Sequence, residues 1–264
     1  MPELPEVESF RKYFHSNALN KKIKNAEVES SKMLGKISSK SLQKNLKGSN
    51  FKSTKRHGKN LFAELNNNKW LLLHFGMSGF LKYYKNKSEA PKHIRLLIDF
   101  ENGWHLAFDD LRKFGKIDLV DDADGYIKKK KLGADPIEDK ISFKKFYELL
   151  QNKKGTIKSI LLNQQIIAGI GNLYSDEILF QAGIHPGLSI KKIKENEFKN
   201  IYNKMNSVLK KAISVKADEN KFPKSYLFVH RKTGDDCPKC SGEIDKKTIA
   251  GRTSYFCKKH QKKK

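Results

Sequence analysis

The strongest constraint on the fold of this chain is a series of short apolar runs, which are separated by residues typical of turns. The runs occupy positions 61–65, 70–75, 80–84, 94–100 and 104–108. Asparagine or glycine stands between them, at 66–68, 76, 79 and 102–103. Runs of this length and spacing are typical of antiparallel strands in a two-sheet fold. We therefore predict a β-sandwich in this half of the chain, with helices at its edges.

Helical periodicity replaces this pattern in the second half, at 143–150, 157–162, 175–181 and 197–215. Positions 5–17 also read as a helix, because Pro5 suits a first turn and Val7, Phe10 and Phe14 share one face. The stretch 121–139 mixes acidic residues, lysines and glycines with little periodicity, as a linker does. We predict an α+β chain with two domains: an N-terminal β-sandwich with flanking helices, and a C-terminal helical domain. The boundaries we expect are 1–122, a linker at 123–139, a helical domain at 140–230 and a metal-binding module at 231–264.

The charge balance predicts a polyanionic partner. The 264 residues include 54 Lys and Arg but 29 Asp and Glu, which gives a formal net charge of +25. Nucleic acid is the first candidate, because each phosphate that Lys or Arg neutralises releases condensed counterions. An acidic membrane surface and a merely lysine-rich composition are the alternatives. No apolar run approaches the roughly 20 residues of a membrane span, and the N-terminus lacks signal-peptide features, so we expect neither a secreted nor an integral membrane protein.

The three cysteines all fall in the last 30 residues and form a paired pattern with one histidine. Two residues separate Cys237 from Cys240, sixteen residues follow, and Cys257 and His260 repeat the spacing. This pattern predicts a tetrahedral site for one structural Zn²⁺ that supplies the folding energy of a small module. The alternative is three unrelated thiols and a chance histidine. Basic and aromatic residues around the pattern favour a nucleic-acid finger, and Arg252 is the residue we expect to meet a phosphate.

Two further features suggest anion binding and nucleophilic chemistry. Gly169 and Gly171 precede a helical run, and such glycines let backbone amides approach an anion; a tight corner between helices is the alternative. Removal of Met1 would expose the secondary amine of Pro2, and an α-amine titrates near about 7.7–8.0. Attack of this amine on the anomeric carbon of a sugar would give an iminium, with Glu3 as the adjacent acid or base. The alternative for this segment is a simple helix cap.

Together these residues closely resemble the formamidopyrimidine-DNA glycosylase and endonuclease VIII family. Positions 2–8 match the N-terminal signature of the family, and five further motifs follow in its order, at 56–59, 74–79, 112–115, 170–172 and 251–253. The resemblance implies a base-excision repair DNA glycosylase with lyase activity at abasic sites, which removes oxidised or ring-opened bases from damaged duplex DNA. It implies a helix–two-turns–helix motif and a β-hairpin zinc finger in the C-terminal domain, with DNA in the cleft between the domains. It also implies a monomer without a small-molecule cofactor that is cytoplasmic and nucleoid-associated in a prokaryote.

The resemblance also implies roles for individual residues. Pro2 corresponds to the Schiff-base nucleophile and Glu3 to the proton donor at the sugar. The catalytic residues that it implies are Pro2, Glu3, Glu6, Lys59 and Arg252. The DNA-binding residues that it implies are His74, Met77, His93, Arg112, Phe114, Lys153, Lys158 and Asn172, among which Met77, Arg112 and Phe114 fill the gap left by an extruded base. The zinc ligands are Cys237, Cys240, Cys257 and His260.

The chain departs from the family pattern at three places. His260 replaces the usual fourth cysteine, and Leu111 stands where the family often has proline before Arg112. The segment from Lys216 to Leu227 is shorter than the glycine-rich loop that caps 8-oxoguanine in one branch. Ring-opened purines and oxidised pyrimidines are therefore alternative substrates. A catalytically silent damaged-DNA-binding protein and a zinc-ribbon RNA-binding protein are the alternatives from other functional classes.

Overall fold

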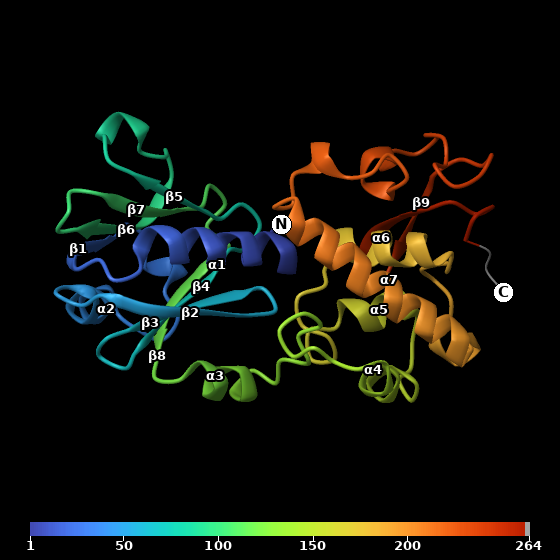
Figure 1. Ribbon diagram of the computed structural model, residues 1–264, viewed down its shortest axis with the longest axis horizontal. Coiled ribbons are helices and arrows are strands. Elements are labelled where there is room, and N and C mark those ends of the chain that lie inside the picture. Colours follow the sequence, from blue (N-terminus) through green and yellow to red (C-terminus); the bar gives the residue numbers. More distant parts are fainter. Residues whose placement is uncertain (262–264) are drawn as a thin grey trace. The chain divides into compact units, whose positions relative to one another are not determined.

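Two four-stranded antiparallel sheets form the first half of the protein, which a computed structural model describes over residues 1–261 (Figure 1). The strand order is β1-β6-β7-β5 in one sheet and β2-β3-β4-β8 in the other. The strands are β1 (Ile23–Val28), β2 (Phe51–His57), β3 (Asn60–Leu65), β4 (Trp70–His74), β5 (Phe80–Tyr84), β6 (Ile94–Phe100), β7 (His105–Asp109) and β8 (Lys116–Val120). The predicted antiparallel sandwich is confirmed.

The core of the sandwich is built from both sheets and two helices. Alternate side chains of each strand face inward, as in other packed sheets. Helices α1 (Leu4–Ala18) and α2 (Ser39–Leu46) contribute apolar residues to the same core. The fully buried ring of Phe14 on α1 packs edge-on against Phe51 of β2, with the ring centroids 4.9 Å apart. Helix α1 is thus an integral part of the first hydrophobic core.

Three strands lie outside the apolar runs that the sequence displays: β1, β2 and β8. Each is an edge strand of its sheet. Edge strands pair on one side only and carry more polar and charged residues than central strands, as the Lys and Arg residues of β2 illustrate. Their alternation is therefore too weak to identify them from sequence.

The second half of the protein is helical and has its own core. Its helices are α4 (Phe143–Leu150), α5 (Ile157–Leu162), α6 (Asn172–Ala182) and α7 (Glu195–Ser214). The hydroxyls of Ser142 and Thr156 accept hydrogen bonds from the first turns of α4 and α5 and so fix where these helices begin. Apolar side chains of all four helices form one buried cluster. The helices predicted from periodicity are confirmed. Short 3₁₀ helices occur at η1 (Ser31–Met33), η2 (Lys87–Glu89), η3 (Ile190–Lys192), η4 (Glu219–Lys221) and η5 (Leu227–His230).

Part of the stretch predicted as a linker, 123–139, is helical. Helix α3 (Ala123–Lys129) begins after Asp122, whose carboxylate accepts hydrogen bonds from the amides of Asp124 and Gly125. Ala123 is buried in a small cluster with side chains of the sheet β2-β3-β4-β8. The chain divides into two compact units, residues 1–2 with 6–131 and residues 3–5 with the chain from Leu132 onward.

The hairpin of β9 (Asp245–Ile249) and β10 (Arg252–Phe256) belongs to the second unit. Side chains of this region share a buried cluster with Phe180 of α6 and Leu227. The predicted module at 231–264 is therefore packed against the helices, and its last three positions, 262–264, lie outside the described residues. Among the described helices, none has both the length and the apolar character that crossing a membrane requires.

Replacement of Phe14 by alanine should lower the free energy of unfolding by about 3–5 kcal/mol, because it leaves a large cavity between α1 and the sheets. Urea denaturation of purified protein measures this loss. Phe80→Ala is the matched control, since that ring is 38% exposed, and it should cost much less. Equal losses in the two variants would contradict the core described here.

Candidate active site and nucleic-acid interface

The carboxylate of Glu3 occupies the amino-terminal end of α6. It accepts hydrogen bonds from the backbone amides of Gly171 (2.7 Å), Leu173 (2.9 Å) and Tyr174 (3.3 Å). Unsatisfied amides and the helix dipole make such an end a binding site for an anion. A Cβ atom at Gly171 would lie 2.4 Å from the carboxyl carbon of Glu3, so the glycine is required for this approach. The sequence predicted an anion at these glycines, and the structure identifies that anion as Glu3.

The residues on either side of Glu3 are fixed by the same contact. Leu4, the first residue of α1, donates its amide hydrogen to the carbonyl oxygen of Gly169 at 3.1 Å. Pro2 is half-buried and directly precedes Glu3, and Glu6 is half-buried in the first turn of α1. Because consecutive Cα atoms are about 3.8 Å apart, anchoring of Glu3 also restricts where the nitrogen of Pro2 can lie.

Lys59 and His74 meet at one end of the sheet β2-β3-β4-β8. Lys59 follows Gly58 in the turn between β2 and β3, and Asn60 pairs with His74 across β3 and β4. Burial, followed by the charges of Lys59 and Lys116, lowers the pKa of His74 to about 4. Its Nδ1 accepts a hydrogen bond from the amide of Gly76 at 3.2 Å. The neutral imidazole therefore carries its proton on Nε2 and can donate it to a phosphate oxygen.

A buried ion pair supports the turn that bears Lys59, and sequence reasoning missed it. The fully buried guanidinium of Arg56 donates to Glu8 at 3.2 Å and to the carbonyl oxygen of Gly58 at 3.1 Å. Arg11 also donates to Glu8, at 2.7 Å. Burial acts to raise the pKa of Glu8, but the two arginines outweigh it and hold that pKa below its ordinary value. The only sequence signal was the position of Arg56 and Glu8 within two of the matched motifs.

The residues predicted to fill a gap in DNA are exposed and close together. Met77 is 41% exposed and Phe114 is 54% exposed, and the guanidinium of Arg112 lies over the ring of Phe114, 4.9 Å from its centroid. His93, another predicted DNA-binding residue, is half-buried, and its amide donates to Asp109 at 2.5 Å. Large exposed apolar side chains of this kind mark a binding surface.

Asn172 and Arg252 come together through the hairpin. The side-chain amide of Asn172, the first residue of α6, donates to the carbonyl oxygen of Thr253 at 2.9 Å. Arg252 is the adjacent, exposed residue at the start of β10. Lys153 is exposed after the end of α4. All three residues belong to the second unit.

The prediction that Lys158 contacts DNA is not supported by its position. Its side chain is fully buried, and its ammonium group donates to Asp176 and, at 2.6 Å, to the hydroxyl of Ser254. Asp176 in turn accepts hydrogen bonds from Arg231 at 2.8 Å and from the amide of Tyr255 at 3.2 Å. The lysine therefore holds β10 against α6 from inside the unit. In sequence it cannot be distinguished from the many exposed lysines.

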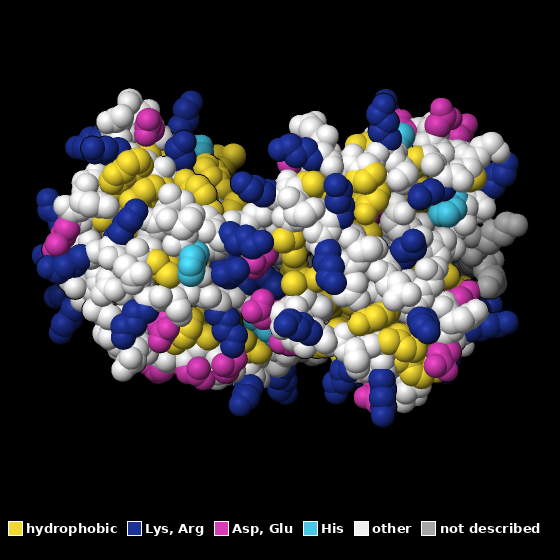
Figure 2. Space-filling view, viewed as in Figure 1, with side chains coloured by type: hydrophobic (Ala, Val, Ile, Leu, Met, Phe, Trp, Pro, Cys, Tyr) yellow, Lys and Arg dark blue, Asp and Glu magenta, His cyan; other side chains and the backbone are white. Residues whose placement is uncertain are grey.

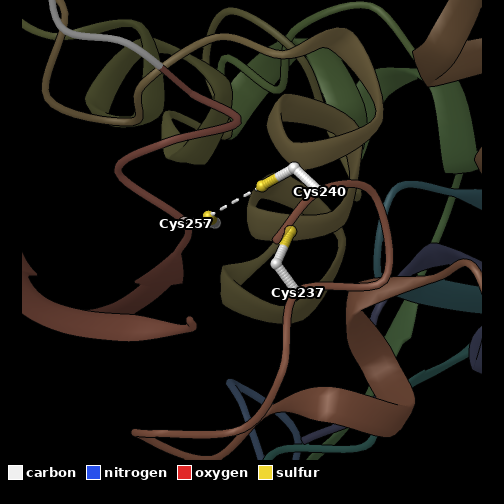
Figure 3. Close-up of side chains that lie close together, drawn as sticks. All are labelled: Cys237, Cys240 and Cys257. Carbon is white, nitrogen blue, oxygen red and sulfur yellow. Dashed lines mark hydrogen bonds between the residues drawn. The ribbon is translucent and has the colours of Figure 1, made fainter. Parts of the chain in front are cut away.

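The three cysteines converge near the hairpin, as Figure 3 shows. Their sulfur atoms lie within 4.8 Å of one another, and those of Cys240 and Cys257 are 3.6 Å apart. A Cβ atom at Gly242 would lie 3.0 Å from the sulfur of Cys257, so the glycine keeps room around the thiols. Three thiolate donors in this arrangement fit a metal ion such as zinc.

His260 does not join this group of ligand atoms in the described part of the chain. Its Nε2 donates to the carbonyl oxygen of Phe180 at 2.8 Å, and its ring packs near the Phe180 ring, 4.9 Å between centroids. Its backbone amide faces the sulfur of Cys257 at 3.5 Å. The predicted fourth ligand thus stays a prediction, and the structure shows only three converging donors.

These groups can bind a polyanion, and Pro2 directly precedes a fixed carboxylate. Figure 2 shows Lys and Arg side chains scattered over the visible face of both units, in keeping with the net charge of +25. Cationic side chains and a neutral imidazole donor are suitable for phosphate. The exposed apolar and aromatic side chains are suitable for stacking between bases.

Two family models cover most of the chain. Residues 1–117 match the model described as the formamidopyrimidine-DNA glycosylase N-terminal domain, and residues 132–224 match the one described as its H2TH domain. A formamidopyrimidine-DNA glycosylase of Mycoplasma mobile is 35% identical over 99% of both chains. One from Streptococcus pneumoniae R6 is 33% identical over the full length of both.

Solved structures of one bacterial enzyme share the fold. The Lactococcus lactis formamidopyrimidine-DNA glycosylase non-covalently bound to DNA with an abasic site has a TM-score of 0.90 and 32% identity to this chain. The same enzyme with DNA containing the ring-opened lesion Fapy-dG has a TM-score of 0.90 and 31% identity. Both comparisons cover 99% of this chain and 100% of the other.

The lowered pKa of His74 should make the protein less stable in acid. Protonation favours the unfolded chain, in which the pKa of histidine stays near 6.5. The contribution of the neutral imidazole to the free energy of unfolding is therefore complete above about pH 6.5 and is lost as the pH falls towards about 4. The pKa difference corresponds to a loss of about 2–3 kcal/mol in the free energy of unfolding at pH 4. Urea unfolding at pH 7 and pH 4 measures the loss, and His74→Gln should reduce it. His15→Gln, at an exposed position, should not; an unchanged acid loss in His74→Gln would refute the assignment.

Proposed function

The chain belongs to the formamidopyrimidine-DNA glycosylase family of base-excision repair enzymes, and from this premise we propose that it both releases the damaged base and cleaves the DNA strand at the resulting abasic site. Pro2 is the nucleophile of the proposed reaction, after removal of Met1. The observation that carries the proposal is the anchoring of Glu3 by three amides at the amino-terminal end of α6, since it holds a carboxylate directly beside the reacting amine.

The proposed reaction proceeds through a covalent iminium. The nitrogen lone pair of Pro2 forms a bond to C1′ of the damaged nucleotide, and the bond from C1′ to the base breaks. The Pro2 nitrogen loses its proton in this step, and the departing base takes one up. Opening of the sugar ring, with a proton delivered to its oxygen, gives the iminium between Pro2 and C1′. Loss of a proton from C2′ then expels the 3′ phosphate, and a second elimination expels the 5′ phosphate. Glu3 is suitable for the proton transfers at the sugar because its carboxylate position is fixed.

The phosphate contacts that we propose come from both units. In the first unit we propose that Lys59 and His74 donate to phosphate oxygens, and in the second unit Asn172 and Arg252. Lys153 and His93 contact the flanking backbone. Met77, Arg112 and Phe114 fill the stack after the damaged base is extruded. Lys158 is left out of this set, because its buried bonds to Asp176 and Ser254 make it a support for β10.

We propose ring-opened purines and oxidised pyrimidines as the main lesions. The segment from Lys216 to Leu227 is short and is held by α6. Gln181 donates to the carbonyl oxygen of Ser225 at 3.1 Å, and Glu177 accepts from the amide of Phe228, the residue after the segment, at 3.0 Å. A segment tied down in this way has little freedom to fold over an 8-oxo base. The Lactococcus lactis relative has been solved with DNA containing Fapy-dG, which is a ring-opened purine.

The metal of the proposed enzyme is one Zn²⁺ with a structural role. Cys237, Cys240 and Cys257 would hold it, and His260 is the fourth ligand that we propose. The ion, when bound, crosslinks the segments on either side of the hairpin. The hairpin then presents Arg252, while the bonds of Asp176 and Lys158 keep β10 against α6.

Borohydride trapping tests the nucleophile. Protein with a processed N-terminus should form a covalent adduct with duplex DNA that carries an abasic site, and a tag retained before Pro2 should abolish it by blocking the amine. Pro2→Gly keeps a terminal amine and should retain a reduced yield. Glu27→Gln, an exposed carboxylate on β1, is the control for charge and should be fully active. Strand cleavage by the blocked protein at the same rate as by the unblocked protein would exclude this mechanism.

Removal of the metal should loosen the hairpin while the helical core stays folded. Cys257→Ser should lose the single zinc of the native protein, and the amides of β9 and β10 should exchange their hydrogens faster, because the crosslink is gone. Elemental analysis and hydrogen exchange measure these changes. Lys258→Ala, next to the site, is the matched control. Full zinc content in Cys257→Ser would show that this thiol is not a ligand.

A further inference from the structure

Three of the six large apolar side chains that are exposed among the described residues lie on two loops of the first unit. Among the described residues, Met77, Leu111 and Phe114 are 41%, 59% and 54% exposed. They lie on the loops 76–79 and 110–115, which follow β4 and β7. We refer to these two loops together as the wedge. Exposed apolar side chains that gather in one patch mark an interaction surface.

The two loops of the wedge touch through their backbones. A Cβ atom at Gly76 would lie 2.4 Å from the carbonyl carbon of Phe114 and 2.5 Å from the amide nitrogen of Gly115. Gly76 also has a φ of +58°, which disfavours other residues. No larger residue could hold the loops at this separation, so the tip of one loop rests directly on the other.

One buried carboxylate joins the loops by hydrogen bonds. Asp110 is fully buried, and its Oδ1 accepts from the hydroxyl of Ser78 at 2.5 Å, while its Oδ2 accepts from the amide of Gly115 at 2.7 Å. The amide of Arg112 lies within 3.2 Å of Oδ1 and 3.1 Å of the Ser78 hydroxyl. The carboxylate therefore binds donors from both loops at once.

The backbone of Asp110 is fixed to the neighbouring strand. Its amide donates to the carbonyl oxygen of His93 at 3.0 Å, and its carbonyl oxygen accepts from the guanidinium of Arg95 at 2.9 Å. Arg95 lies on β6, in the centre of its sheet. The carboxylate at the base of the wedge is thus anchored to the sandwich itself.

We propose that Asp110 is a positioning residue which, together with Ser78, holds both loops as one preassembled wedge before DNA binds. This inference rests on the proposed function, because the wedge carries Met77, Arg112 and Phe114. Ordering the loops in advance removes a cost that binding would otherwise include. The wedge then enters the stack as a rigid unit, and the base is extruded without a separate step in which the loops fold.

The hydrogen bonds at the base of the wedge require a carboxylate at position 110. Three donors converge on the two oxygens of Asp110, and a carboxylate is an acceptor at every lone pair. Asparagine would turn an NH₂ group towards at least one of these donors. Asp110→Asn should therefore release one loop, whereas Ser78→Ala removes one hydrogen bond and leaves the bonds to Arg112 and Gly115 in place.

The experiment compares two duplexes that carry a ring-opened guanine, one with cytosine opposite the lesion and one with a one-nucleotide gap opposite. The gapped duplex does not need a wedge to hold the stack open. Asp110→Asn should excise the lesion opposite cytosine about 100-fold more slowly, the size of effect that misplacement by about 1 Å produces. Ser78→Ala should show about a tenfold loss, the value of one hydrogen bond. Both variants should be close to the unmodified protein on the gapped duplex.

Two matched controls accompany the variants. Ser53→Ala removes a hydroxyl on β2 that donates to Glu64 at 2.6 Å. Asp122→Asn alters the cap of α3. Neither residue is part of the wedge. Both variants should therefore show the same ratio of excision rates on the two duplexes as the unmodified protein. Fluorescence of 2-aminopurine placed opposite the lesion reports stacking directly, and its change on binding should be smaller in Asp110→Asn.

Equal losses on the two duplexes would overturn the proposal, because they would show a general structural role, and so would unchanged rates. If Asp110→Asn does not fold, Ser78→Ala decides by the same ratio. Failure of the proposed function has a different signature: the unmodified protein would then give no borohydride adduct at an abasic site. A normal adduct, together with an unchanged ratio of the rates on the two duplexes in both variants, would refute only the positioning role of Asp110 and Ser78.

Discussion

The bond between a carboxylate and a helix end is the interaction on which the proposed chemistry depends. Glu3 satisfies three amides of α6 that would otherwise lack partners in the helix. In return, the helix fixes the first residues of the chain, which would ordinarily be mobile. An amine at a chain terminus is a poor catalyst unless its position is restricted, so this contact converts a flexible end into part of a site.

The sequence predicted the central strands, the helices of the second half and the thiol cluster, because each depends on local pattern. The edge strand β2 escaped detection, since its lysines and Arg56 hide its alternation. The burial of Lys158 could not be predicted, because it depends on its bonds to Asp176 and to Ser254, the latter 96 positions away. The ring of His260 faces the carbonyl oxygen of Phe180, 80 residues earlier, and no spacing rule reports such a contact.

Buried charges hold the loops of this very basic protein. Arg56 bonds to Glu8, 48 positions away, Lys158 bonds to Ser254, 96 positions away, and Asp110 bonds to Ser78, 32 positions away. Buried ion pairs contribute little net stability, but removal of one partner is costly. We interpret these groups as devices that fix geometry: each lies beneath a segment whose exposed residues are proposed to meet DNA.

The contact of Glu3 also sets an order of events during synthesis. Its partner amide at Gly171 is 168 residues further along the chain, and a ribosome adding about 5–20 residues per second makes it roughly 10–30 s later. Until then the amides that anchor the N-terminus do not exist, and Met1 can be cleaved from an open end. Once α6 has formed, Glu3 is 2% exposed. The first residues of the chain are therefore anchored only after α6 has been synthesised, whereas Met1 itself stays 56% exposed in the folded protein.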